Sequence, residues 1–151
     1  MPRSTKLPIT INNRFLACLR VAVIATSASC GIRAGNVTLI PVAFEGWVVI
    51  RYQVPGAPSL DREGARTMVK VPASGSLSTS SDSPYGYGID EYYLVGTDGE
   101  RVRIQGEADG CNGQGTACIQ HYEFTSSPIM AATCFVGKKQ NLPRYPKPTV
   151  P

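Results

Sequence analysis

The 151 residues include a single histidine, His121. Serine and cysteine hydrolases use a histidine as the general base, so any such site in this chain would depend on that one side chain. No serine lies in a Gly-x-Ser-x-Gly motif. His121 is part of an alternating, strand-like stretch, where a histidine usually lies on the surface or is satisfied by its neighbours. We therefore predict that the protein is not an enzyme.

Other reaction centres also lack the spacing they need. Asp90 and Glu91 are adjacent in a predicted strand and should point to opposite faces, which argues against a paired acid and base. Asp98 begins an Asp-Gly turn without the spaced acids of a calcium loop. Gly86 and Gly88 precede a strand, whereas phosphate-binding glycines precede a helix. We expect no catalytic residue and no cofactor.

Basic residues are in excess only at the ends of the chain. The formal charge is +4, but the first 29 residues hold four basic residues and no acid. Residues 33–137 hold seven basic against eleven acidic side chains. An acidic body lacks the basic surface that binds phosphate backbones, so we expect no nucleic-acid partner.

The first 29 residues have the layout of an export signal. A basic segment, 1–14, precedes an apolar run from Phe15 to Ala25 and the small residues of 26–29. The apolar run has about 11 residues and is interrupted by Arg20, whereas a membrane-spanning helix needs about 20 apolar residues. We predict that residues 1–29 form an export-signal helix.

Cys30 follows these small residues directly, as in the bacterial lipoprotein signal. In that signal the leader is cut before the cysteine, which then carries lipid. Ser27 stands where the lipoprotein pattern usually has leucine, and Arg20 is a second departure from it. Two alternatives are cleavage after Ala28 or Ser29 without lipid, and an N-terminal helix packed on the domain. We favour lipidation of Cys30, with residues 30–36 as a tether and the bacterial cell envelope as the location.

Residues 37–136 read as one all-β domain. The stretch Asn36 to Val54 predicts a first pair of strands hinged at Glu45-Gly46, with Val48, Ile50 and Tyr52 on one face of the second strand. Asp98-Gly99 is a strong hairpin signal. Turn signals recur every eight to twelve residues, and no segment after residue 30 has a sustained helical period. Further strands are expected at 67–71, 75–79, 89–95, 100–105, 118–124 and 129–136.

We therefore expect a small, single-domain antiparallel β-sandwich, similar in size to transthyretin or an immunoglobulin domain. Residues 137–151 contain four prolines, no acid and no periodicity, and we interpret them as a disordered basic tail.

Short segments along the domain resemble a family of small bacterial lipoproteins that contain a domain of unknown function. They are a Leu-Ile-Pro segment at 39–41, Phe44-Glu45-Gly46, Val71-Pro72 with Gly75 to Thr79, and Asp90-Glu91-Tyr92-Tyr93 with Asp98-Gly99. The resemblance covers about 37–104 and includes no chemical motif. It implies export, a lipidated N-terminal cysteine and a compact β domain. It transfers no activity and no catalytic residue.

Five cysteines give several possible pairings, and Cys18 leaves with the leader. If Cys30 carries lipid, Cys111, Cys118 and Cys134 remain, which allows one disulfide in an oxidising compartment. We favour Cys111 joined to either of the other two; a bridge from Cys111 to Cys118 would contribute about 2.5 kcal/mol. Without lipid, four cysteines allow two bridges. Zinc held by these three cysteines and His121 is a competing arrangement, but it has only one short spacing.

Four tyrosines are the best candidates for a binding surface. Tyrosine offers a flat apolar ring with a polar tip, which suits sugars, peptides and protein partners. The ordinary alternative is that these tyrosines fill the core or cover a strand. We predict a non-catalytic binding or interaction module, anchored to the membrane through its N-terminal lipid and acting on an unknown protein or glycan. The second hypothesis is a secreted sugar- or peptide-binding sandwich using this surface, which comprises Tyr85, Tyr87, Tyr92 and Tyr93.

Overall fold

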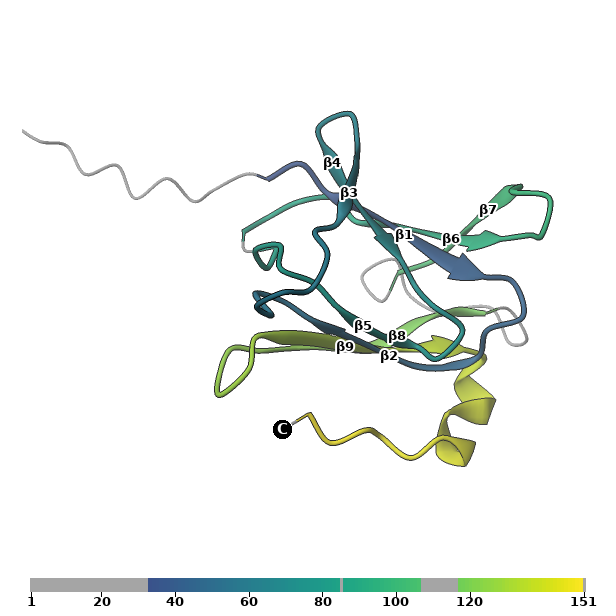
Figure 1. Cartoon of the computed structure of the whole chain (residues 1–151). Coiled ribbons are helices and arrows are strands. Elements are labelled where there is room, and N and C mark those ends of the chain that lie inside the picture. The colour runs from purple at the N-terminus through teal and green to yellow at the C-terminus, as the bar shows by residue number, and fades with distance from the viewer. Residues whose placement is uncertain (1–32, 85, 107–116, 151) are drawn as a thin grey trace, which may run out of the picture.

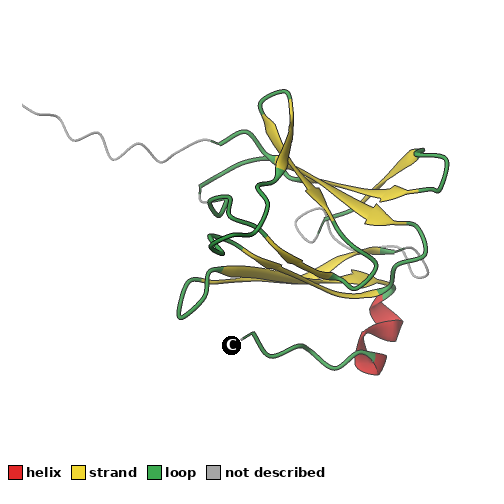
Figure 2. Ribbon diagram, viewed as in Figure 1, coloured by secondary structure: helices red, strands yellow, loops and turns green. Residues whose placement is uncertain are grey.

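A computed structural model describes residues 33–84, 86–106 and 117–150. Within these ranges nearly all regular structure is β, in two sheets that face each other (Figures 1 and 2), which confirms the all-β prediction. The same ranges contain no helix long and apolar enough to cross a membrane. The strands are β1 Asn36–Pro41, β2 Gly46–Arg51, β3 Asp61–Glu63, β4 Arg66–Lys70, β5 Ser76–Ser78, β6 Glu91–Val95, β7 Arg101–Ile104, β8 Cys118–Thr125 and β9 Ala131–Gly137.

Both sheets are mixed, so the prediction of an antiparallel sandwich is wrong. One sheet has the order β3-β4-β1-β6-β7 and the other β5-β2-β9-β8. Strand β1 is parallel to both of its neighbours, β4 and β6, and β2 is parallel to β5. The chain crosses between the sheets from β1 to β2, from β2 to β3, from β4 to β5, from β5 to β6 and from β7 to β8. The parallel partners are therefore joined through the opposite sheet rather than by a hairpin.

The first two strands illustrate this crossing. We expected 36–54 to form one strand pair, but β1 and β2 lie in opposite sheets. A tight corner separates them: the amide of Phe44 donates to Pro41 O (2.9 Å), and Gly46 has a φ of 146°, a value that side chains disfavour. Phe44 then packs against the core between the sheets.

Local predictions did better than long-range ones. The hairpin of β6 and β7 is present, with the Gly96 amide donating to Glu100 O (3.0 Å) and Asp98 Oδ1 accepting from the Glu100 amide (3.0 Å). Strand β2 is central, as its two-sided apolar pattern indicated. Strand β3 was not expected, because its exposed residues Asp-Arg-Glu carry no apolar pattern and it forms only by pairing with β4.

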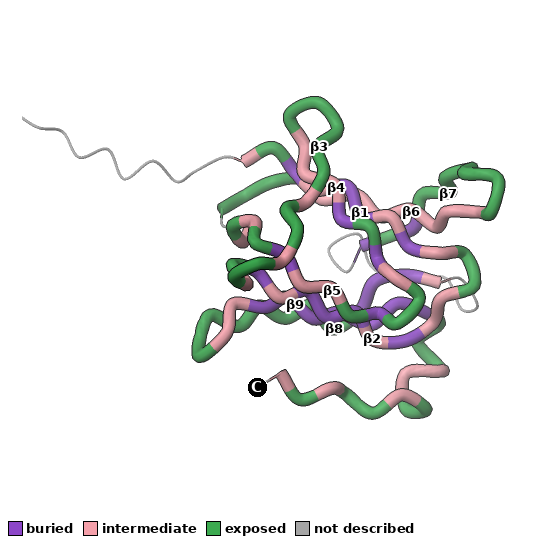
Figure 3. The backbone as a smooth tube through the Cα atoms, in the orientation of Figure 1, coloured by how far each residue is buried: buried purple, intermediate pink, exposed green. Residues whose placement is uncertain are grey.

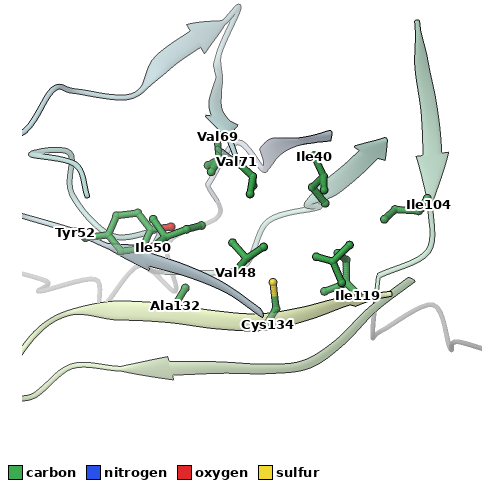
Figure 4. Packing of buried hydrophobic residues seen from close by; sticks show 11 residues of the cluster. Ile40, Val48, Ile50, Tyr52, Val69, Val71, Ile104, Ile119, Ala132 and Cys134 are labelled. Atoms are coloured by element: carbon green, nitrogen blue, oxygen red, sulfur yellow. The ribbon is translucent and has the colours of Figure 1, made fainter. Parts of the chain in front are cut away.

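The core lies between the two sheets (Figures 3 and 4). Val48 and Ile50 of β2 point inward, on the face that their alternation predicted, and Tyr52 continues that face. Buried positions are concentrated where the sheets oppose each other, while the β3–β4 and β6–β7 turns are exposed. The other core residues are Ile40, Val69, Val71, Ile104, Ile119, Ala132, Cys134 and Val136.

Residues 138–150 belong to the segment that we interpreted as a disordered tail, and their first part lies against the four-stranded sheet. A short 3-10 helix, η2 Lys139–Arg144, follows β9 and lies beneath the four-stranded sheet (Figure 1). The indole of Trp47 donates to Tyr145 O (2.9 Å), and the Tyr145 ring packs on Phe135 with ring centroids 5.5 Å apart. Phe135 is fully buried as a result. The predicted signal helix, 1–29, lies outside the described residues.

Candidate functional site

A polar cleft of about 280 Å³ opens at the end of the sandwich where the described chain begins. It brings together three segments that are far apart in sequence: 33–36, the β3–β4 hairpin, and 82–84 in the loop before β6. Arg33 and Arg62 contribute positive charge, Asp82 contributes negative charge, and Tyr52 lines the interior. A cleft that holds both signs of charge is suited to a small polar ligand.

Arg33 and Asp90 form a two-point ion pair that builds one wall of the cleft. Arg33 Nη1 donates to Asp90 Oδ1 at 2.8 Å, and Nη2 donates to Oδ2 at 2.7 Å. The backbone amide of Asn36 also donates to Asp90 Oδ1 at 2.7 Å. The two side chains are only 18% and 22% exposed. The hydrogen bonds that Arg33 donates to Asp90 raise the pKa of Arg33 above its usual value, so the guanidinium stays charged.

Two glycines allow the segment around Arg33 to lie against the segment before β6. A Cβ at Gly35 would lie 1.6 Å from the carbonyl oxygen of Ile89, and one at Gly88 would lie 2.8 Å from Arg33 Cγ. The close approach lets the Arg33 amide donate to Tyr87 O (2.8 Å). Substitution of either glycine would therefore displace backbone or the Arg33 side chain at the cleft wall.

Behind this ion pair lies a narrow cavity of about 20 Å³ between the sheets. It is lined by Asp90, by the rings of Tyr52, Tyr92 and Tyr122, and by Cys134. Most of its other lining is apolar, and a cavity of this size has room for about one water molecule and no larger ligand. We therefore place the candidate ligand site in the outer cleft.

The inner tyrosines stay protonated at any physiological pH. Burial raises the pKa of Tyr52, Tyr92 and Tyr122, and the negative charge of Asp90 adds to the rise in each case. Tyr52 is 4% exposed although its hydroxyl is polar. These hydroxyls therefore keep their protons and act as hydrogen-bond donors rather than as bases.

A bulge in β8 brings Tyr122 to this cavity. The β8–β9 register shifts between Gln120 and Glu123, and His121 adopts a positive φ of 50°. The extra residue reverses the alternation, so Tyr122 turns inward while His121 packs beside Trp47 on the outer face, with ring centroids 6.4 Å apart. Simple alternation in 118–124 gave no sign of this.

The tyrosines predicted as one surface are not brought together. Tyr87 is 78% exposed beside the cleft, Tyr92 points between the sheets, and Tyr93 lies on the outer face of the five-stranded sheet. Tyr85 lies outside the described residues. Tyr92 and Tyr93 do not share a face, because they are adjacent strand residues with opposite directions.

Asp90 and Glu91 do point to opposite sides, as predicted. Glu91 Oε2 accepts hydrogen bonds from Arg66 Nη1 (2.6 Å) and the Tyr93 hydroxyl (2.9 Å) on the outer face. These bonds, that from Arg66 first, lower the pKa of Glu91 to about 2. His121 lies on the other sheet, so the structure does not bring it together with Asp90 or Glu91. Within the described ranges no group of three potential metal ligands converges.

Strand register excludes a disulfide between Cys118 and Cys134. Cys118 pairs with Gly137 across β8 and β9, three positions from Cys134 and on the opposite face of the sheet. Such a separation exceeds the about 7 Å between Cα atoms that a disulfide can span. Cys134 is a buried thiol in the core. Because Cys134 is a thiol, a bridge from Cys111 to Cys134 is excluded as well, and the predicted pairing that remains is Cys111 with Cys118. Cys30 and Cys111 lie outside the described residues.

Sequence reasoning missed the cleft residues. Arg33, Arg62 and Asp82 come from three segments with no common spacing, and only the fold makes them neighbours. The one available signal was the length of the polar loop 80–88, since long loops in small domains are often functional.

Comparisons with known proteins agree with this fold and leave the chemistry open. Residues 33–140 match the model of a family of unknown function, DUF6843. A crystal structure named "Putative Lipoprotein from Bacillus anthracis" is similar, with a TM-score of 0.54 and 22% sequence identity over 80% of this chain and 82% of that chain. No match was found among curated proteins.

Replacing Asp90 by asparagine should destabilise the domain by about 1 to 3 kcal/mol, because a charged hydrogen-bond acceptor is lost and the half-buried Arg33 guanidinium is left without its counter-charge. The measurement is urea unfolding followed by Trp47 fluorescence. Asp61→Asn is the matched control, since its pair with Lys70 is 60% to 63% exposed and should cost less than about 1 kcal/mol. Equal effects of the two variants would show that Arg33 and Asp90 do not organise the cleft wall.

Stability should also depend on pH through Glu91. Its folded pKa of about 2 lies below the usual value of 4.5, so its contribution is fully present above pH 4.5 and is lost as pH falls toward 2. Glu91→Gln should therefore lower stability at pH 6 and flatten the decline between pH 4.5 and 2. Urea unfolding at pH 6 and pH 3 measures this, with Glu100→Gln, a turn carboxylate with no ion pair to the described residues, as control. An unchanged pH slope in Glu91→Gln would contradict the assignment.

Proposed function

The chain belongs to DUF6843, a family of unknown function, and we propose that it is an exported, lipid-anchored envelope protein whose β domain is a binding module. Two features support the anchor: the basic, apolar and small-residue leader that ends at Cys30, and the fold shared with a structure named as a lipoprotein. The polar cleft beside the tether is the observation that supports binding.

The ligand we propose for the cleft is a small polar group that carries a carboxylate, such as the end of a peptide or an acidic sugar. Arg62 Nη2 donates to Ala65 O (3.0 Å), and among the described residues the other donors of this guanidinium have no hydrogen-bond partner. Arg62 is exposed at the rim, and a guanidinium binds carboxylates through two parallel hydrogen bonds. Asp82 is held by the Gln53 amide (3.0 Å) and offers an acceptor for hydroxyl or amino groups on the same ligand.

We propose that the cleft binds its ligand without catalysing a reaction. A general acid or base in the cleft would need a pKa near neutrality. Arg33 remains charged and the inner tyrosines remain protonated, which favours recognition over proton transfer. The alternative of a secreted, unlipidated protein with the same cleft stays open and is separated by the first experiment below.

The anchor is tested by the intact mass of the protein recovered from a bacterial host, with and without reduction. We expect a chain that begins at Cys30 and carries acyl groups, and a Cys30→Ser variant without them. Reduction should add the mass of two hydrogens if Cys111 is bonded to Cys118. A chain that begins after Ala28 or Ser29 would support secretion, and one that begins at Met1 would contradict export.

Carboxylate binding is tested by NMR titration of the labelled protein with N-acetylated dipeptides and with uronic-acid disaccharides. Saturable shifts should be confined to residues that line the cleft. Arg62→Ala should weaken binding at least about tenfold, which corresponds to about 1.4 kcal/mol. Arg51→Ala is the control, because this arginine donates to Ser76 away from the cleft. Equal weakening by both variants, or shifts spread over the whole surface, would exclude the cleft as the site.

A further inference from the structure

Two large apolar side chains are exposed where the tether meets the domain. Tyr87 is 78% exposed and Ile89 is 75% exposed, more than any other large apolar residue among those described. Both belong to the segment that pairs with the start of the described chain: the Arg33 amide donates to Tyr87 O (2.8 Å), and Gly35 packs against Ile89. We call Tyr87 and Ile89 the tether-side pair.

The distance from this pair to the lipid is limited by the chain itself. Cys30 and Arg33 are three residues apart, so even a fully extended chain separates them by at most about 10 Å. The headgroup layer on each side of a bilayer is about 5 to 8 Å thick. A domain tethered this closely must hold the Arg33 end against the membrane surface.

We propose that the tether-side pair inserts into the headgroup region of the membrane and sets the orientation of the domain. This inference rests on the proposed lipidation of Cys30 and names the surface that the anchored domain contacts. Tyrosine suits the interface because its ring is apolar and its hydroxyl is polar, and isoleucine gains from leaving water. The occupant of this surface is therefore a lipid bilayer.

The same orientation directs the opposite end of the sandwich away from the membrane. Val42, in the corner after β1, and Val102, in β7, are 58% and 56% exposed. Strand β1 runs away from the tether toward this far end, where β7 also lies (Figure 1). Val42 and Val102 are thus exposed apolar residues of similar kind that the proposal keeps in water.

The experiment compares a tryptophan at the tether-side pair with one at the far end of the sandwich. The lipidated full chain is prepared in three forms, wild type, Tyr87→Trp and Val102→Trp, and is reconstituted into phosphatidylcholine–phosphatidylglycerol vesicles with or without brominated acyl chains. Bromine quenches tryptophan only at short range. We expect the emission added by Tyr87→Trp to fall by about half or more in brominated vesicles and to shift to shorter wavelength. The emission added by Val102→Trp should fall no more than that of Trp47 in the wild type.

Each outcome decides between the claims. If the protein is lipidated but bromine quenches the emission added by Tyr87→Trp as weakly as that added by Val102→Trp, the insertion is overturned and the lipid anchor stands. Blue-shifted Tyr87→Trp emission without bromine quenching, together with a doubled mass by cross-linking, would assign the pair to contact between copies of the chain and also overturn it. A mass without acyl groups would overturn the anchor and the insertion together. Both substituted positions are exposed, so circular dichroism is expected to show the same fold in all forms.

Discussion

The ion pair between Arg33 and Asp90 connects the features that distinguish this sandwich. It joins the first described residue to the segment before β6, 57 positions later, and Asp90 also accepts the amide at the start of β1. Without this carboxylate the Asn36 amide and the guanidinium would lose their acceptor in a place only about one-fifth exposed. The pair separates the inner cavity from the outer cleft, and it holds the tether beside Tyr87. One electrostatic contact therefore organises the core end, the cleft and the approach of the chain.

Two adjacent carboxylates at the start of β6 form ion pairs on opposite faces of the sheet. Asp90 turns toward the interior and binds Arg33, while Glu91 turns outward and binds Arg66 and Tyr93. Each arginine comes from an element that precedes β6 by many residues, and these pairs bring the N-terminal segment and β4 against its start. Strand β1 lies between β4 and β6 and is parallel to both, so the pair of Arg66 with Glu91 links the two strands that flank it. Charge thus helps to align a parallel arrangement that has no hairpin to set its register.

Sequence reasoning succeeded where the cause is local. The Asp-Gly turn specified the β6–β7 hairpin, and the alternation of Val48 and Ile50 identified a central strand, because both effects depend on neighbouring residues. It failed where the cause is distant. Contacts between residues about 30 to 100 positions apart determine three features. These are the parallel pairs of β1, the packing of the C-terminal segment through Trp47 and Tyr145, and the cleft around Arg33. The β8 bulge at His121 reversed an alternation that looked regular.

If Cys30 carries lipid, as we propose, the charge of the body favours an apolar contact with the membrane over an electrostatic one. Residues 33–137 carry seven basic and eleven acidic side chains, a balance that anionic lipids repel rather than attract within the about 8 Å over which charge acts at physiological salt. The four basic residues of the C-terminal segment only bring residues 33–151 to eleven basic and eleven acidic side chains, and Lys147 already pairs with Glu123. Net charge therefore gives the domain no attraction that could orient it at an anionic surface. Exposed tyrosine and isoleucine next to the tether supply an attraction that salt does not screen.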